Sequence, residues 1–292
     1  MSTRAADECV SLFKEEEFRI QLFMDAVRAF FALNPALNGD PAVVHSTKSR
    51  MKDPKHLHKK IQRKNEEEPG DPITAANFFA RVTDLAGVRI LHLHQQQFVD
   101  ISRQIERQLQ AREWALHEQP KAYTWDPEAS RFFQSLGLKV ELKESMYTSV
   151  HYVVRPREDS PISCEIQIRT LFEEIWGEID HQLNYPEKCG NVACVEQLRV
   201  LSKLVGAGSR LGDAIFRTYR EWLETLKAVE PRKGAEPDAS VSALRTPPAG
   251  SLDVIPEAAV APTRTAEVRP DSAAANEPAN PTTDGADSGI DA

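Results

Sequence analysis

The residues best suited to chemistry in this 292-residue chain lie in the segment 163–169, with the sequence SCEIQIR. Side chains alternate between the two faces of a β-strand, so Glu165, Gln167 and Arg169 share one face, opposite a thiol and two isoleucines. A carboxylate, an amide and a guanidinium in one row can form the floor of a polar site. The alternative is an edge strand with one solvated face.

A second polar row precedes it, where Tyr147, Ser149 and His151 share one face of an expected strand. If the two strands pair, their polar faces join, and the tyrosine ring lies at the rim of the common floor. An aromatic ring in that place can stack on a nucleobase. The alternative is that Tyr147 belongs to the hydrophobic core.

A third group begins at Asp84, in the sequence DLAGVR, just before an apolar run. Gly87 permits a close approach of another backbone at the entrance of a strand. A carboxylate there is suited to Mg²⁺, which is usually held by one or two carboxylates together with phosphate oxygens. The alternative is a turn aspartate followed by a surface arginine, Arg89.

A dense basic cluster lies upstream of these groups and is suited to a polyphosphate or a nucleic acid. The alternative is a solvated basic face. The cluster consists of Lys48, Arg50, Lys52, Lys55, Lys59, Lys60, Arg63 and Lys64.

Other metal or redox patterns are weak. Cys189 and Cys194 have the spacing of neither a CxxC pair nor a zinc knuckle, and His92 and His94 have no evident third ligand. We therefore expect the two histidines in the core or at its rim, and the four cysteines as reduced thiols.

These groups must be positioned by helices and strands that interleave along the chain, which predicts an α/β or α+β domain. The expected strands are residues 88–94, one strand within 114–123, and residues 138–142, 148–155 and 162–169. The expected helices are residues 4–33, a short helix with Pro54 in its first turn, another capped by Thr74, and residues 96–113, 171–183 and 192–227.

Composition separates the C-terminal tail from the rest. From Lys233 onward the chain has ten acidic and four basic residues and no aromatic residue, because the last aromatic is Trp222. Such a segment buries too little apolar surface to offset its chain entropy, and disorder is expected. We predict an N-terminal helical segment (1–44), a central domain (45–190), a C-terminal helix (191–228) and a disordered tail (229–292). The sequence has no apolar run near the roughly 18 residues of a membrane span and no signal-peptide pattern, which favours a cytoplasmic protein.

Taken in order, these motifs resemble the synthetase domain of the RelA/SpoT family, the (p)ppGpp synthetases. The resemblance covers about residues 45–186. The matching residues are Arg50-Met-Lys52 with Lys59-Lys60; Asp84, Gly87 and Arg89; Lys143 with Tyr147, Ser149 and His151; the run EIQIRT from Glu165; and Trp176, Glu178, His181 and Tyr185. His56 and Met146 depart from the pattern, standing where many members have Ser and Gly.

The resemblance implies a nucleotidyltransferase-like mixed sheet flanked by helices. It also implies transfer of the β,γ-pyrophosphate of ATP to the 3′-hydroxyl of GDP or GTP, with Mg²⁺ as cofactor. Long members add a hydrolase domain with a His-Asp dyad; this chain has no His-Asp dipeptide and looks like a small, synthetase-only member.

The resemblance also assigns roles residue by residue. Asp84 and Glu165 would hold the metal, and Glu165 would also accept or orient the hydroxyl proton. The ATP site would consist of Arg50 and Arg89 around the adenine, and Lys52, Lys59 and Lys60 on the phosphates. The acceptor site would consist of Tyr147 on the guanine, Lys143 and His151 near the phosphates or ribose, and Gln167, Arg169 and His181 as supports.

Two other functions remain open. A toxin-like relative would pyrophosphorylate the 3′ end of tRNA or adenosine nucleotides, and the basic cluster could serve an RNA acceptor. A catalytically silent nucleotide-binding protein would lack a metal carboxylate, whereas both Asp84 and Glu165 are present. The helix expected at 192–227 either docks on its own domain or pairs with a second copy.

Overall fold

The computed structural model describes residues 2–184 and 188–229, which lie within one compact unit. Its helices are α1 (Ser2–Leu33), α2 (Pro54–Glu67), α3 (Phe78–Arg81), α4 (Phe98–Gln110), α5 (Pro127–Ser135), α6 (Leu171–Asn184) and α7 (Val192–Val229), with a 3₁₀ turn, η1 (Gln95–Gln97). Its strands are β1 (Ser46–Met51), β2 (Ala86–His92), β3 (Ala115–Leu116), β4 (Lys121–Thr124), β5 (Lys139–Leu142), β6 (Ser149–Arg155) and β7 (Cys164–Thr170). Within these ranges no helix is both long and apolar enough to cross a membrane.

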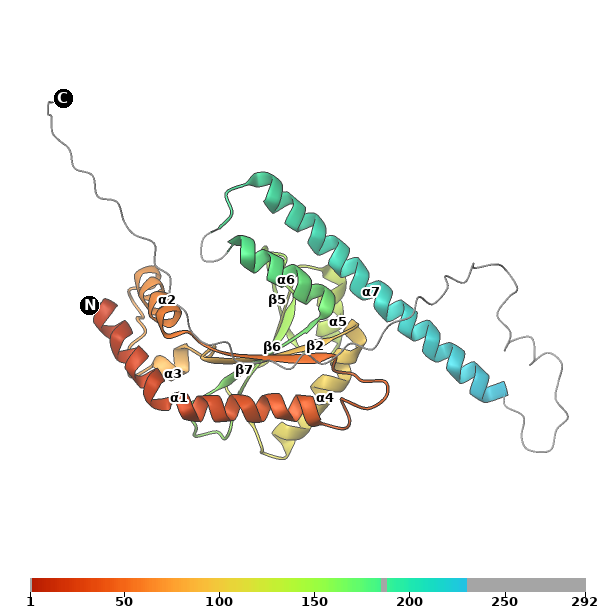
Figure 1. The fold of residues 1–292 in the computed structure, drawn as a ribbon, viewed down its shortest axis with the longest axis horizontal. Coiled ribbons are helices and arrows are strands. Elements are labelled where there is room, and N and C mark those ends of the chain that lie inside the picture. Colours follow the sequence, from red (N-terminus) through yellow and green to blue (C-terminus); the bar gives the residue numbers. More distant parts are fainter. Residues whose placement is uncertain (1, 185–187, 230–292) are drawn as a thin grey trace, which may run out of the picture. The chain divides into compact units, whose positions relative to one another are not determined.

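The strands form one mixed sheet in the order β1-β2-β7-β6-β4-β5, and β3 pairs with β6 (Figure 1). The β2–β7 and β4–β5 pairs are parallel, and the other pairs are antiparallel. The predicted mixed sheet flanked by helices is therefore confirmed. Strand β7 lies in the middle of the sheet, so the edge-strand interpretation of SCEIQIR is wrong.

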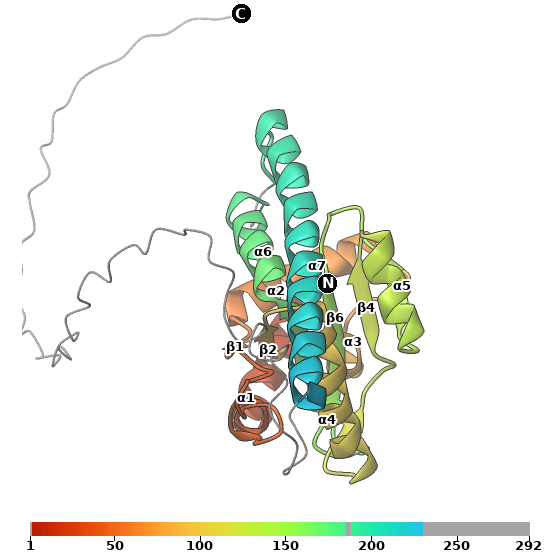
Figure 2. The same ribbon diagram turned by 90° about the vertical axis from the view of Figure 1, so that its right-hand side faces the viewer.

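The two faces of the sheet have opposite chemistry. Cys164, Ile166 and Ile168 of β7 are buried in the main core, and α1 contributes Phe13, Ile20, Val27 and other apolar side chains to the same core. Figure 1 shows α1 on one side of the sheet and α6 on the other, and Figure 2 shows α6 and α7 side by side. The alternation within β7 thus directs its apolar row toward α1 and leaves its polar row for the side of α6.

Three local expectations need correction. Thr74 does not cap α3, because Asn77 precedes that helix and its side-chain oxygen instead accepts a hydrogen bond from the Thr74 backbone N–H. Residues 46–51 form the strand β1, which is not among the expected strands, although Arg50 and Lys52 alternate like strand neighbours. The strand expected at 88–94 begins two residues earlier and ends at His92.

Helix α2 begins as predicted from Pro54. Asp53 caps it by accepting a hydrogen bond from the His56 backbone N–H at 2.9 Å. Leu57 and Ile61 anchor the helix in the core, and its basic side chains lie on the remaining surface. The cap and the anchor together fix the direction in which Lys60 points.

A capping box begins α6 directly after β7. The Glu173 carboxylate accepts the Thr170 backbone N–H at 2.7 Å, and the Thr170 hydroxyl accepts the Glu173 backbone N–H at 3.2 Å. Burial raises the pKa of Glu173 to about 7, against the opposing effects of these hydrogen bonds and of Arg169.

This raised pKa gives a stability prediction for Glu173→Gln, which can keep the capping box but carries no charge. The pKa of Glu173 rises from 4.5 to about 7 on folding, so the wild type loses stability as pH increases through that window. We expect the advantage of Glu173→Gln in free energy of unfolding to grow by on the order of 1–2 kcal/mol between pH 5 and pH 8. Urea unfolding at the two pH values measures it, and an advantage independent of pH would contradict the assignment.

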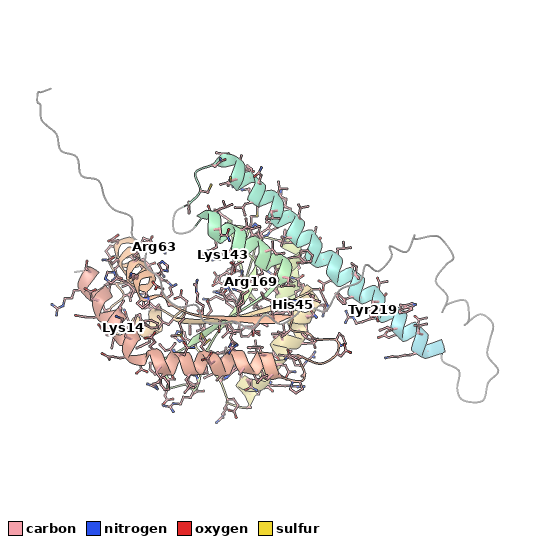
Figure 3. The ribbon with its side chains drawn as sticks, viewed as in Figure 1. Lys14, His45, Arg63, Lys143, Arg169 and Tyr219 are labelled. Atoms are coloured by element: carbon pink, nitrogen blue, oxygen red, sulfur yellow. The ribbon has the colours of Figure 1, made fainter. Side chains whose placement is uncertain are left out.

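Helix α7 docks on α6 through a small buried patch. Trp176, Leu198 and Val205 form this second core cluster, and the Trp176 indole donates to the Leu198 carbonyl at 3.1 Å. The helix continues well beyond the patch, where Tyr219 and Trp222 are exposed (Figure 3). Docking on its own domain therefore buries only part of the apolar surface of α7, and the rest stays exposed.

Candidate active site

Strands β2, β7 and β6 lie side by side and combine their polar rows into one floor. Gly87 of β2 is in register with Glu165 of β7, and Gln167 lies between Arg89 and His151. The predicted pairing of the two polar strands is present. An added Cβ at Gly87 would lie 3.9 Å from the Glu165 carbonyl oxygen, an ordinary contact, so backbone packing does not require glycine there. Because Gly87 lines the open cleft, a larger side chain would instead fill space at its floor.

A hydrogen-bond relay runs across this floor to Glu165. Arg169 donates to the Tyr147 hydroxyl at 3.1 Å, and that hydroxyl lies 2.9 Å from His151 Nε2. His151 Nδ1 is 2.8 Å from Glu165 Oε1. Since the tyrosine hydroxyl accepts from Arg169, its own hydrogen is available to His151, whose other nitrogen then donates to the carboxylate.

Gln167 completes the support of Glu165. Its amide donates to Glu165 Oε2 at 2.7 Å and its oxygen accepts from Arg169 at 2.9 Å. Burial opposes ionisation of Glu165, but the hydrogen bonds from His151 and Gln167 outweigh it and hold the pKa below its ordinary value. Glu165 is therefore an oriented, ionised carboxylate.

Asp84 is the second carboxylate of the floor and lies just before β2. Lys52 Nζ is 2.9 Å from one of its oxygens, and Lys60 Nζ is 2.7 Å from the other. Burial opposes the charge, but Lys60 and Lys52 overcome that cost and lower the pKa of Asp84 to about 2. Two of the predicted phosphate-binding lysines thus converge on the predicted metal carboxylate.

Two clefts adjoin over the floor. The first has about 880 Å³ of empty space and contains both Asp84 and Glu165 in its wall. The second has about 890 Å³ and includes Tyr147 and Arg169 in its wall. Figure 3 shows Arg169 over the sheet on the side of α6. The side chains common to both linings are Arg50, Arg89, Gln167 and Glu178.

Helix α6 supplies two carboxylates that the sequence reasoning did not assign to the site. Arg89 donates to Glu174 at 2.8 Å and to Glu178 at 2.7 Å, and Lys48 donates to Glu174 at 2.8 Å. Glu174 also lies 3.3 Å from Arg169. These ion pairs hold the Arg89 guanidinium at the junction of the two clefts.

Tyr123 of β4 is a further residue that the sequence reasoning missed. Its ring lies edge-on to His151 with centroids 4.8 Å apart, and the Lys143 ammonium lies 4.4 Å from the Tyr123 ring centroid. Lys143 is therefore connected to His151 through the Tyr123 ring. The only sequence signal for Tyr123 is its place in a short strand, which acquires meaning once β4 pairs with β6.

The remaining predicted site residues lie farther out. His181 lines the second cleft from α6, whereas Lys59 is exposed on α2 and belongs to neither lining. Tyr185, the last residue of the family pattern quoted above, lies outside the described residues.

His92, at the end of β2, and His94, just after it, have structural partners. His92 is buried and its Nδ1 is 3.0 Å from the His94 carbonyl oxygen. His94 Nδ1 is 2.7 Å from Asp213 of α7, and its ring stacks on Phe216 at 4.5 Å. This pair connects the end of β2 to α7.

A divalent cation needs oxygen ligands, and carboxylates line the first cleft. Across residues 2–184 and 188–229, no group of three or more His, Cys, Asp and Glu side chains is arranged to hold a metal ion. Asp84 and Glu165 do share one cleft, which matches Mg²⁺, an ion that takes few protein ligands and fills its shell with phosphate oxygens and water. The residues present therefore fit a cation that binds together with a phosphate ligand.

One face of this mixed α/β sheet thus combines carboxylates with the basic side chains of Lys48, Arg50 and Arg89. Residues 49–190 match the family model described as a region found in RelA / SpoT proteins. The motif-based resemblance is thereby confirmed.

Two curated relatives are both from Bacillus subtilis (strain 168). GTP pyrophosphokinase YjbM is 32% identical over 159 residues, which cover 52% of this chain and 65% of that protein. GTP pyrophosphokinase YwaC is 28% identical over 149 residues, covering 51% of this chain and 61% of that protein. The chain thus spans less than two thirds of the length of these relatives.

Solved structures show the same fold. The small alarmone synthetase 1 from Bacillus subtilis, crystallised with its product pppGpp, has a TM-score of 0.50 at 21% identity and covers 72% of this chain and 98% of its own. A GTP pyrophosphokinase family protein from Streptococcus pneumoniae has a TM-score of 0.53 at 20% identity, covering 71% and 95%.

Proposed function

We propose that this protein is a pyrophosphokinase that transfers the β,γ-pyrophosphate of ATP to the 3′-hydroxyl of GDP or GTP. The 3′-oxygen forms a bond to the β-phosphorus, the bond from that phosphorus to the bridging α-phosphate oxygen breaks, and AMP leaves. The observation that carries the proposal is the pair of carboxylates, Asp84 and Glu165, in one cleft bordered by the basic residues of β1, β2 and α2.

The first cleft is the proposed ATP site. Arg50 and Arg89 line it from neighbouring strands, and planar guanidinium groups are well suited to stack on an adenine. Lys52 and Lys60 would turn from Asp84 to the phosphate oxygens, and Lys59 on the exposed side of α2 would meet the outer phosphate.

The second cleft is the proposed acceptor site. The Tyr147 ring would stack on the guanine, with Lys143 and His151 near the acceptor's phosphates or ribose. Glu165, held by His151 and Gln167, would accept the proton of the 3′-hydroxyl, and its low pKa keeps it ionised for that task. Arg169 and His181 would support the pocket.

Mg²⁺ would be held by Asp84 and Glu165 together with the phosphate oxygens. When bound, it supplies neutralisation of the charge that gathers on the transferred group. Asp84 would exchange its two lysine partners for the cation as those lysines move to the phosphates, which keeps the local charge balanced.

The test is a transfer assay with purified protein, γ-labelled ATP and Mg²⁺, in which GDP, GTP, AMP, ADP, ATP and deacylated tRNA are offered separately. Label on GDP or GTP is expected. Label on tRNA or on an adenosine nucleotide would replace the proposed acceptor, with steep salt dependence supporting the RNA. Absence of transfer from folded protein that binds nucleotide would identify a silent family member.

We further propose that α7 pairs with α7 of a second copy. Four exposed apolar residues share one side of the helix at spacings of four, seven and four, a pattern typical of paired helices. They are Val200, Leu204, Leu211 and Ile215, between 57% and 63% exposed.

If two copies pair through α7, substitutions in this apolar row should lower the molar mass of the particle in solution. The double variant Leu204→Gln, Leu211→Gln should shift a dimer toward monomer in light scattering behind size exclusion, by more than about tenfold in Kd. Lys203→Gln, an exposed change outside this apolar row of α7, is the matched control. A wild type that is monomeric at all tested concentrations would refute the pairing.

A further inference from the structure

Met146 has a backbone conformation that its side chain disfavours. Its φ is +64°, in the left-handed region, where residues with a Cβ are strained. It ends a turn in which the Met146 backbone N–H donates to the Lys143 carbonyl at 3.3 Å. Such strain persists only where the surroundings determine the conformation.

The surroundings of Met146 are the contact between α6 and α7. Its side chain packs against the cluster of Trp176, Leu198 and Val205. The Trp176 indole donates to the Leu198 carbonyl and so fixes the two helices to each other at that point. Met146, together with the neighbouring Tyr147, therefore attaches the β5–β6 loop to the helical pair.

Tyr147 follows directly and is held at both ends. Its hydroxyl is bonded to His151 at 2.9 Å and to Arg169 at 3.1 Å, and its ring lies 5.2 Å from the Arg169 guanidinium carbon. Its backbone is held by Met146. The position of the ring in the second cleft thus depends on the docking of α7 as well as on the sheet.

We propose that Met146 is a positioning residue that couples the α6–α7 contact to Tyr147, so that the packing of α7 sets the affinity for the acceptor nucleotide. The identity of that nucleotide rests on the proposed function. The coupling itself rests on the left-handed φ, the Met146 packing and the adjacency of Tyr147.

The first test needs no nucleotide. Leu198→Ala removes apolar contact beneath Met146, and Met146→Gly removes the anchor while suiting the positive φ. Both variants should speed amide hydrogen exchange at residues 144–148 by at least about fivefold, and leave the exchange at residues 84–90 unchanged. Equal protection of the loop in all variants would overturn the coupling.

The second test separates acceptor from donor. Calorimetric titration should show GDP binding weakened about fivefold or more by Met146→Gly and by Leu198→Ala, with the Kd of a non-hydrolysable ATP analogue unchanged. Met146→Leu, which keeps an apolar side chain, should bind GDP as tightly as the wild type. The double variant Met146→Gly, Leu198→Ala should raise the Kd for GDP by less than the product of the two single fold-changes. An equal loss of affinity for both nucleotides, or a double variant whose fold-change equals that product, would refute a specific coupling.

The two tests and the transfer assay distinguish failure of the Met146 proposal from failure of the proposed reaction. A wild type that binds GDP but transfers no label refutes the proposed reaction and leaves the GDP comparison valid. A wild type that transfers label, with variants of unchanged GDP affinity and loop exchange, refutes the role of Met146 alone.

Discussion

Glu165→Gln is expected to lower the rate of pyrophosphate transfer by about 10³-fold, within the range typical for loss of a general base. Glutamine keeps the volume of the side chain and its place between His151 and Gln167, but it has no negative charge to accept the hydroxyl proton. The measurement is the rate of label transfer to GDP at saturating nucleotide, which separates chemistry from binding.

The fold should survive this change. Glu165 is a half-buried carboxylate whose hydrogen bonds lie on the open side of the sheet, and the opposite face of β7 keeps its apolar packing. Glu158→Gln, on an exposed loop, is the matched control and should be fully active. A folded Glu165→Gln variant with normal turnover would remove Glu165 from the mechanism.

Asp84→Asn has the second-largest expected effect, a loss of about 10²–10³-fold in transfer. The amide is a poor ligand for Mg²⁺ and no longer balances Lys52 and Lys60. This variant should also need a higher Mg²⁺ concentration for half-maximal rate, because one of the two proposed metal ligands is lost. Activity measured across a Mg²⁺ titration shows the shift, and an unchanged titration curve would contradict the metal assignment.

Asp84 also gives a pH-dependent effect on stability. Its pKa is lowered from 3.8 to about 2, so its stabilisation is complete above pH 3.8 and is lost as pH falls toward 2. Between pH 6 and pH 3 the wild type should lose about 1 kcal/mol more free energy of unfolding than Asp84→Asn. Urea unfolding at both pH values measures the difference, and parallel losses would show that the lysines do not stabilise the charge.

Much of the floor could be predicted because strand alternation is a local property. The polar row of Glu165, Gln167 and Arg169 follows from the period of two, and so does the apolar row packed toward α1. The central place of β7 could not be predicted in the same way. A polar row on an edge strand and a polar row beneath a cleft have the same sequence pattern.

The site residues that the sequence did not predict are brought to the site by tertiary packing. Glu174 and Glu178 meet Arg89 only because α6 crosses the sheet with one particular rotation, and no spacing within α6 specifies that rotation. Tyr123 joins the site only through the pairing of β4 with β6. Likewise Asn77 precedes α3 instead of Thr74, because the local loop bonds decide where that helix begins.

The parallel pairing of β2 with β7 has a consequence for how the protein is made. Gly87 and Glu165 are neighbours in the sheet, yet all of α4, β4, α5, β5 and β6 is synthesised between them. Closing so long a loop is slow compared with forming local helices. A nascent chain on the ribosome therefore has Asp84 and its lysines long before it has Glu165, and the complete cleft forms only after β7 inserts between β2 and β6.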